Sequence, residues 1–138
     1  MSQPGWPAPD PSVTSAVLAL YDALSTTDDD WLAELIADDA SVVVIGTDPQ
    51  EWWDGFDAVK ELWSRTRARY GPNTLRARRL AGHSLGGLAW ATDEPSFGYP
   101  GGQTGRLRLS MVFARGDAGW LLLHLHASIG VPNGDVFA

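Results

Sequence analysis

The sequence contains no cysteine among its 138 residues. This absence excludes a disulfide framework, a thiolate zinc site and a cysteine nucleophile, and it fits a reducing compartment. No apolar run approaches the ~20 residues of a membrane span. Residues 1–11 also lack the positive charge and apolar segment of a signal peptide. We therefore expect a soluble cytoplasmic protein that makes no use of a membrane.

Positive charge is absent from residues 1–59, which hold twelve acidic residues, and the net charge of the chain is −7. Such an acidic protein is poorly suited to phosphate backbones, so no nucleic-acid partner is expected. Residues 60–79 are the exception, with seven basic residues and one acidic residue. The arginines from Arg65 to Arg79 either form a solvated surface that pairs with the acidic half or grip an anionic partner.

Motifs for phosphate loops, dinucleotide folds, nucleophile elbows and zinc-protease helices are also missing. We therefore expect no cofactor and no metal. The His124-x-His126 pair has a known ligand spacing, but a zinc site needs a third ligand, and no cluster supplies one.

The length predicts one domain. Residues 1–11, rich in proline, read as a flexible arm, residues 12–133 as the domain, and residues 134–138 as a tail. Apolar spacing predicts helices over about 12–25, from 27 to the aspartates at 38–39, and from 54 or 55 to 70. We expect Ser12 and Thr27 to cap the first two. Strands are predicted over about 40–45, 74–83, 88–97, 104–114 and 120–129. This order, ααβαββββ with an antiparallel sheet, is typical of the α+β class.

Strand alternation predicts which side chains share a face. Leu107, Leu109, Met111 and Phe113 alternate with arginines and small residues. If the last hairpin has no bulge, cross-strand pairing places Trp120, Leu122, His124, His126 and Ser128 on the same inner face. The alternate leucines, Leu121, Leu123 and Leu125, with Ala127, would then face outward. Because this second face is also apolar, we expect a homodimer through the outer face of the sheet.

The run Trp120-Leu-Leu-Leu-His124-Leu-His126-Ala-Ser128-Ile-Gly-Val-Pro132-Asn133 resembles the SnoaL-like branch of the nuclear transport factor 2-like superfamily. Its Trp-x-x-x-His-x-His-x-Ser pattern is similar to the association domain of calcium/calmodulin-dependent protein kinase II. The stretches 37–42, 45–49 and 52–55 resemble two further junctions of the superfamily, so the resemblance covers about residues 12–133. It implies a cone-shaped curved sheet around helices, a concave pocket, and dimers through the outer sheet face.

The superfamily includes isomerases, dehydratases, polyketide cyclases, carriers and assembly modules, so the fold alone does not define an activity. The acidic positions of ketosteroid isomerases match Val44 and Met111 here. Their helix tyrosine matches Leu20, with Tyr21 adjacent. The resemblance therefore does not carry over that isomerase mechanism.

Three side chains are candidate proton carriers. His124 and His126, ~7 Å apart on one strand face, could act as general bases in an apolar surround. Glu94 would share the pocket face with Trp90 and Thr92, where a raised pKa would suit proton transfer, whereas Asp93 would face outward. Alternatively, the histidines are hydrogen-bonded structural groups and Glu94 reaches solvent at a strand end.

Seven tryptophans suggest flat pocket walls. Trp52 and Trp53, adjacent in a loop, suggest a lid or an interface, whereas Trp63 also suits simple core filling. The predicted ligand contacts are Tyr21, Trp52, Trp53, Trp63, Trp90, Thr92, Met111, Phe113 and Ser128. Three functions stay open: a pocket for an apolar aromatic or cyclic small molecule, a cofactor-independent acid/base enzyme of the cyclase, isomerase or dehydratase type, and a structural dimerisation module.

Overall fold

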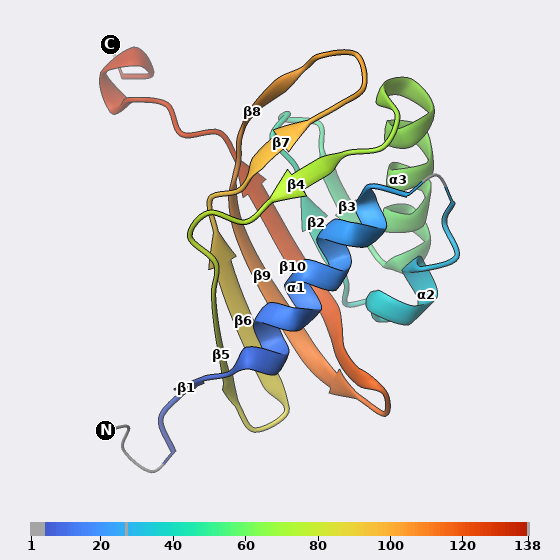
Figure 1. Ribbon diagram of the computed structural model, residues 1–138, viewed down its shortest axis with the longest axis vertical. Helices are drawn as coiled ribbons and strands as arrows, with labels where there is room; N and C mark the ends of the chain where they lie inside the picture. Colours follow the sequence, from blue (N-terminus) through green and yellow to red (C-terminus); the bar gives the residue numbers. More distant parts are fainter. Residues whose placement is uncertain (1–4, 27, 138) are drawn as a thin grey trace.

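A curved seven-stranded sheet wraps around one long helix (Figure 1). The structure, a computed structural model, describes residues 5–26 and 28–137. The strand order is β1-β5-β6-β9-β10-β2-β3, and β4, β7 and β8 form a second small sheet. The bounds are β1 Ala8–Pro9, α1 Pro11–Leu24, α2 Leu32–Leu35, β2 Val43–Ile45, β3 Trp52–Asp54, α3 Phe56–Tyr70, β4 Thr74–Arg76, β5 Ala81–Leu85, β6 Leu88–Asp93, β7 Ser96–Gly98, β8 Thr104–Arg106, β9 Arg108–Gly116, β10 Gly119–Ser128 and the 3-10 helix η1 Asn133–Asp135.

The α+β class and the cone-shaped sheet predicted from the sequence are confirmed. The sheet is mixed rather than purely antiparallel, because β10 pairs in parallel with β2. Ala8 and Pro9, in the predicted arm, pair with β5. Among the described residues, no helix combines the length and the apolar character needed to cross a bilayer.

Helix α1 fills the concave face of the sheet. Its predicted apolar stripe is buried, with Val13 and Val17 fully enclosed. Gly82 of β5 permits the close approach, since a Cβ atom there would lie 3.0 Å from Cγ1 of Val13. The helix begins one residue earlier than expected. Asp10, not Ser12, is the cap and accepts from the Ser12 N–H at 2.9 Å, because Pro11 suits the first helical position.

The second predicted helix is much shorter than its pattern suggested. It covers only Leu32–Leu35, and Thr27, its predicted cap, lies outside the described residues. Ile36 leaves the helix in an extended conformation and forms a parallel bridge with Leu122. Pairing with Leu122 of β10 therefore ends this helix earlier than its sequence alone predicts.

Three of the predicted long strands are each divided in two. Asp93, at the end of β6, stands at this division and is buried rather than outward as predicted. Its carboxylate accepts from the N–H groups of Arg79 at 2.7 Å, Arg78 at 3.2 Å and Glu94 at 2.8 Å, and from the Tyr21 hydroxyl at 2.8 Å. These bonds connect α1 to the turns between the two sheets.

A bulge in β10 reverses the predicted faces of the last strand. Leu122 pairs with Phe113 as alternation requires, but the register shifts at Leu123, so that Leu125 pairs with Met111. One extra residue moves every later side chain to the opposite face. Leu125 and Ala127 therefore point inward and are buried, whereas His126 is exposed. The prediction that His124, His126 and Ser128 face inward is wrong for this reason.

Substitution of Tyr21 tests the Asp93 hydrogen-bond cluster. Burial, and then the bond to Asp93, raise the pKa of Tyr21, so its hydroxyl stays a donor. Tyr21→Phe removes a donor to a buried carboxylate, and we expect the free energy of unfolding in urea to fall by about 2 kcal/mol. Tyr70→Phe is the matched control, because the Tyr70 side chain is 38% exposed. Equal losses in the two variants would contradict the role of the cluster.

Candidate functional site

A cavity of about 420 Å³, open to solvent on one side, lies between α1, α3 and the ends of several strands. Its floor is apolar and includes Leu75 of β4, Leu109 of β9, and Leu125 with Ala127 of β10. The bulge in β10 brings the last two into the lining. A volume of this size accommodates a small organic molecule.

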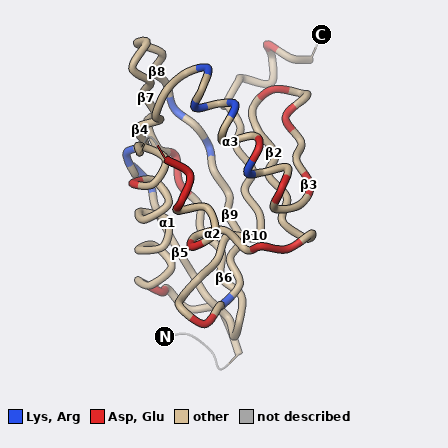
Figure 2. The backbone as a smooth tube through the Cα atoms, turned by 90° about the vertical axis from the view of Figure 1, so that its right-hand side faces the viewer, with Lys and Arg blue, Asp and Glu red and all other residues tan. Residues whose placement is uncertain are grey.

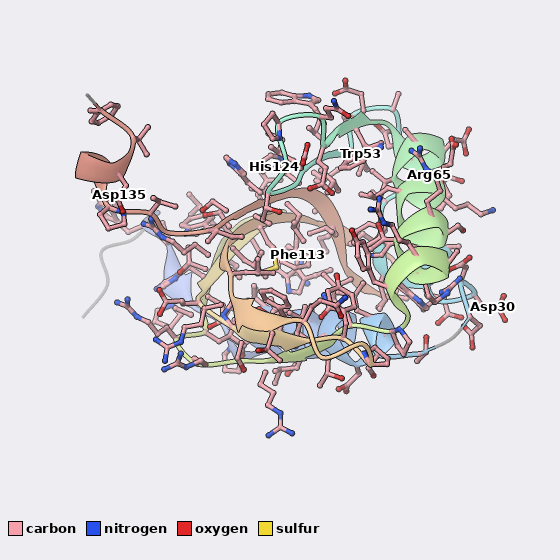
Figure 3. The ribbon with its side chains drawn as sticks, turned by 90° about the horizontal axis from the view of Figure 1, so that it is seen from above. Asp30, Trp53, Arg65, Phe113, His124 and Asp135 are labelled. Carbon is pink, nitrogen blue, oxygen red and sulfur yellow. The ribbon has the colours of Figure 1, made fainter. Side chains whose placement is uncertain are left out.

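Aromatic side chains from β3, α3 and β7, and from the residues just before α2 and just after β7, form the walls of the cavity. They are Trp31, Trp53, Trp63, Tyr70, Phe97 and Tyr99. Trp31 and Trp63 meet edge to face with ring centres 5.7 Å apart, and Tyr99 lies 5.4 Å from Tyr70 and 6.0 Å from Phe97. Such contacts hold the rings in fixed orientations. Trp53 lies where β3 approaches α3 (Figure 3).

The polar residues of the cavity lining come from three parts of the chain. Asp48 and Glu51 come from the loop between β2 and β3, Thr66 and Arg67 from α3, and Asn73 from the segment after it. A Glu51 side-chain oxygen accepts from the Asp48 N–H at 2.8 Å. Burial raises the pKa of Tyr99, and nearby Glu51 raises it further, so the Tyr99 hydroxyl remains protonated.

Arg67 connects the basic end of α3 to the acidic segment before α2. Its guanidinium forms an ion pair with Asp29 and donates to the Asp28 carbonyl at 2.6 Å. The Ser64 hydroxyl also donates to Asp29, at 2.8 Å. The contacts of Arg67 therefore support the first alternative, in which the basic segment pairs with the acidic half of the chain.

The structure separates the predicted site residues into three groups. Trp53 and Trp63 line the cavity, as predicted. Tyr21, Met111 and Phe113 are buried in the core without lining the cavity, so their predicted ligand contacts are not available there. The other seven lie on the outer side of the sheet or at its edge: Trp52, Trp90, Thr92, Glu94, His124, His126 and Ser128.

Two errors of strand parity account for the outward group except Trp52, which lies exposed on the edge strand β3 instead of in the expected loop. Ala89 and Ala91 of β6 face the core, so Trp90 and Thr92 face away from it. His124 follows the bulge and lies on the opposite side of β10 from Phe113 (Figure 3). Its Nδ1 is 3.1 Å from the carbonyl oxygen of Val43, which requires the proton on Nδ1.

A second hollow lies on the outer side of the sheet. It brings together Glu94, Thr92, His126 and Ser128 with two arginines, Arg79 and Arg108, and has a volume of about 570 Å³. Thr92, Ser110 and His126 are neighbours across β6, β9 and β10. Glu94 and His126 thus border the same hollow, although on a different face from the one predicted. Within the described residues, no group of three or more acidic or histidine side chains could hold a metal ion.

Several cavity residues were not identified from the sequence. Tyr70 carries a recognisable signal, because it continues the apolar stripe of α3. Glu51, Asn73 and Tyr99 lie in loops, where periodicity carries no information about direction.

The curved sheet, the helix on its concave face and the cavity enclosed between them define a cone-shaped α+β domain. A family model described as the SnoaL-like domain matches residues 13–132. The chain belongs to the SnoaL-like domain family. Among curated proteins, no sequence matches this chain.

Solved structures with the same fold come from several bacteria. A nuclear transport factor 2-like superfamily protein from Salmonella enterica serovar Typhimurium is 22% identical, with a TM-score of 0.76 over 91% of this chain and 93% of that one. A protein from Streptomyces avermitilis, named a candidate dehydratase, is 20% identical, with a TM-score of 0.76 over 86% and 93%. A Thiobacillus denitrificans protein, named a candidate association domain of calcium/calmodulin-dependent protein kinase type II, is 21% identical, with a TM-score of 0.69 over 89% and 97%. At these identities the similarity shows the fold.

The histidines provide a direct test of whether a small apolar probe binds in the cavity or on the outer face of the sheet. Because His124 and His126 lie outside the cavity lining, we expect His124→Ala and His126→Ala to leave the affinity of the neutral fluorophore N-phenyl-1-naphthylamine unchanged. Fluorescence titration measures this affinity. Trp63→Leu, which alters the cavity wall, should weaken it several-fold. A loss of affinity in the His126 variant equal to that of the Trp63 variant would place the binding site on the outer face.

Proposed function

We propose that the protein binds a small organic molecule with an apolar, aromatic or cyclic body in the cavity beside α3. The observation that carries this proposal is the cavity itself, about 420 Å³ with six aromatic side chains in its lining. Binding sites for small molecules are concave, mostly apolar and equipped with few polar groups, and this cavity has all three properties.

The polar groups of the cavity favour binding over histidine-based catalysis. The lining contains no histidine among the described residues. Its possible proton carriers are Asp48, Glu51 and two tyrosines, and burial raises the pKa of Tyr99. Glu94 and His126, the predicted proton carriers, border the outer hollow instead. Acid/base chemistry by these two residues stays a prediction.

Filling the cavity tests the proposed function. Ala127 lies on its floor with 9% of its surface exposed. Ala127→Phe introduces a ring where the ligand body would lie, so we expect the affinity for N-phenyl-1-naphthylamine to fall at least about tenfold. Ala77→Phe, in an exposed loop away from the lining, is the matched control. Far-ultraviolet circular dichroism checks that both variants fold. Undiminished binding by the folded Ala127 variant would refute the proposal.

We also propose that the protein forms a homodimer through the outer face of the sheet. The bulge turns Leu125 and Ala127 inward, so other side chains make up the apolar part of the outer face. Leu88 of β6 is 52% exposed and Leu85 of β5 is 45% exposed. With Trp90, Val112 and Leu121, these leucines form an apolar strip across neighbouring strands. An exposed apolar strip of this kind is suited to pairing with a second copy of the chain.

A charge placed in this strip tests the dimer. We expect Leu88→Arg to convert a dimer into a monomer in sedimentation velocity, because two like charges would meet across a two-fold interface. Leu18→Arg is the matched control, since Leu18 of α1 is 45% exposed and lies on a helix that covers the opposite side of the sheet. A wild-type protein that sediments as a monomer at all concentrations would contradict the dimer.

A further inference from the structure

We infer that the cavity selects a ligand whose body carries a positive charge, such as an aromatic or cyclic amine or quaternary ammonium compound. This inference rests on the proposed function, because it specifies the chemistry of the ligand in the same cavity. It follows from the charges of the lining, from its aromatic walls and from its hydrogen-bond acceptors.

The charge balance of the cavity is negative. Among its described lining residues, Asp48 and Glu51 are acidic and Arg67 is basic. Arg67 is already neutralised by its ion pair with Asp29, and it also donates to the Asp28 carbonyl. The two carboxylates of the loop between β2 and β3 therefore have no counter-charge in the lining. Each accepts one loop N–H, from Asp48 to Glu51 and from Gln50 to Asp48, and the half-buried Glu51 is less screened by solvent than the exposed Asp48.

Figure 2 shows that basic residues also occur at the C-terminal end of α3, not far from the acidic loop. Arg65 and Arg69 are exposed and do not line the cavity. The Arg69 guanidinium lies 5.1 Å from the centre of the Tyr70 ring, a contact between a cation and an aromatic face. Both arginines are exposed, so solvent screens their charges, but Arg69 already covers one face of Tyr70.

The aromatic walls suit a cation better than an anion. The faces of Trp, Tyr and Phe rings carry partial negative charge and attract ammonium groups, most strongly in sites shielded from water. Tyr70, Phe97 and Tyr99 are in mutual contact at the cavity wall. Glu51 is close enough to raise the pKa of Tyr99, so a carboxylate and a group of rings surround the same space.

Asn73 adds an acceptor to the cavity lining. Its side-chain oxygen is enclosed and accepts no hydrogen bond from the described residues. An unmet buried acceptor destabilises the protein, and an N–H or O–H group of a ligand is one partner that would satisfy it. Glu51 and Asp48 favour a positive charge, and Asn73 favours a hydrogen-bond donor. A quaternary ammonium compound therefore tests the charge preference alone.

Three ligands of the same size distinguish the possibilities: benzyltrimethylammonium, its uncharged carbon isostere neopentylbenzene, and the anion benzylsulfonate. Each competes with N-phenyl-1-naphthylamine bound to the full-length protein, and the fluorescence gives its affinity. We expect the cation to bind about tenfold more tightly than the neutral isostere, and the anion to bind most weakly.

Glu51→Gln identifies the group responsible. Glutamine keeps an oxygen that can accept from the Asp48 N–H, removes the charge and replaces the second carboxylate oxygen with an NH2 group. We expect the affinity for benzyltrimethylammonium to fall several-fold, with no change for neopentylbenzene. Glu61→Gln is the matched control, because Glu61 is exposed on α3 and does not line the cavity.

The possible outcomes separate this inference from the proposed function. If the fluorophore binds but the neutral or anionic compound matches the cation, the charge preference is refuted and the apolar pocket stands. An unchanged affinity of the Glu51→Gln variant for the cation also overturns the inference. If neither the fluorophore nor any of the three compounds binds, both the proposed function and this inference are refuted.

Discussion

The carboxylate of Asp93 holds together the place where the main sheet ends and the second sheet begins. Three backbone N–H groups and the Tyr21 hydroxyl donate to it, in a position that is 6% exposed. A buried carboxylate is stable only when its oxygens are satisfied in this way. Because the donors come from α1 and from the turns on either side of β5 and β6, the carboxylate sets where these elements lie relative to one another.

The cavity depends on this arrangement. Once the strands divide near Asp93, β4, β7 and β8 cross the open end of the cone instead of continuing the main sheet (Figure 1). Phe97 and Tyr99 then reach the side of the cavity that faces α3, and Leu75 reaches its floor. A sheet of long unbroken strands would leave these side chains on a surface elsewhere. The strand division at Asp93 and the position of the aromatic residues in the cavity lining are therefore linked.

The two faces of the sheet have different chemical characters. The concave side encloses an aromatic cavity with carboxylates in its lining. The convex side carries an apolar strip and, next to it, a polar hollow with Arg79, Arg108, Glu94 and His126. The bulge at Leu123 decides which side receives the last histidines. The SnoaL-like fold supports diverse functions, and the proposals here follow from these side chains rather than from the fold.

Local patterns were sufficient for much of the architecture. The stripes of α1 and α3 predicted both long helices, because each helix buries one face against the same core. The motif around His124 and His126 indicated the family. The predicted orientation of these histidines was wrong, because strand alternation assumes a regular strand and one extra residue moves the later side chains to the opposite face. The parity error at Asp93 has a related cause: sequence patterns treat a carboxylate as an outward group, whereas four donors make its burial favourable.

The candidate site was predicted only in part. Trp53 and Trp63 line the cavity as expected, but Glu51, Asn73 and Tyr99 do so from loops whose course depends on distant contacts. The sequence by itself determined the class of fold, the helices that pack in the cone and the family to which the chain belongs, because these depend on periodic burial and on a local motif. Only the tertiary structure decided which residues share the cavity. That choice depends on a single bulge and on hydrogen bonds between residues up to 72 positions apart, neither of which leaves a periodic signal in the chain.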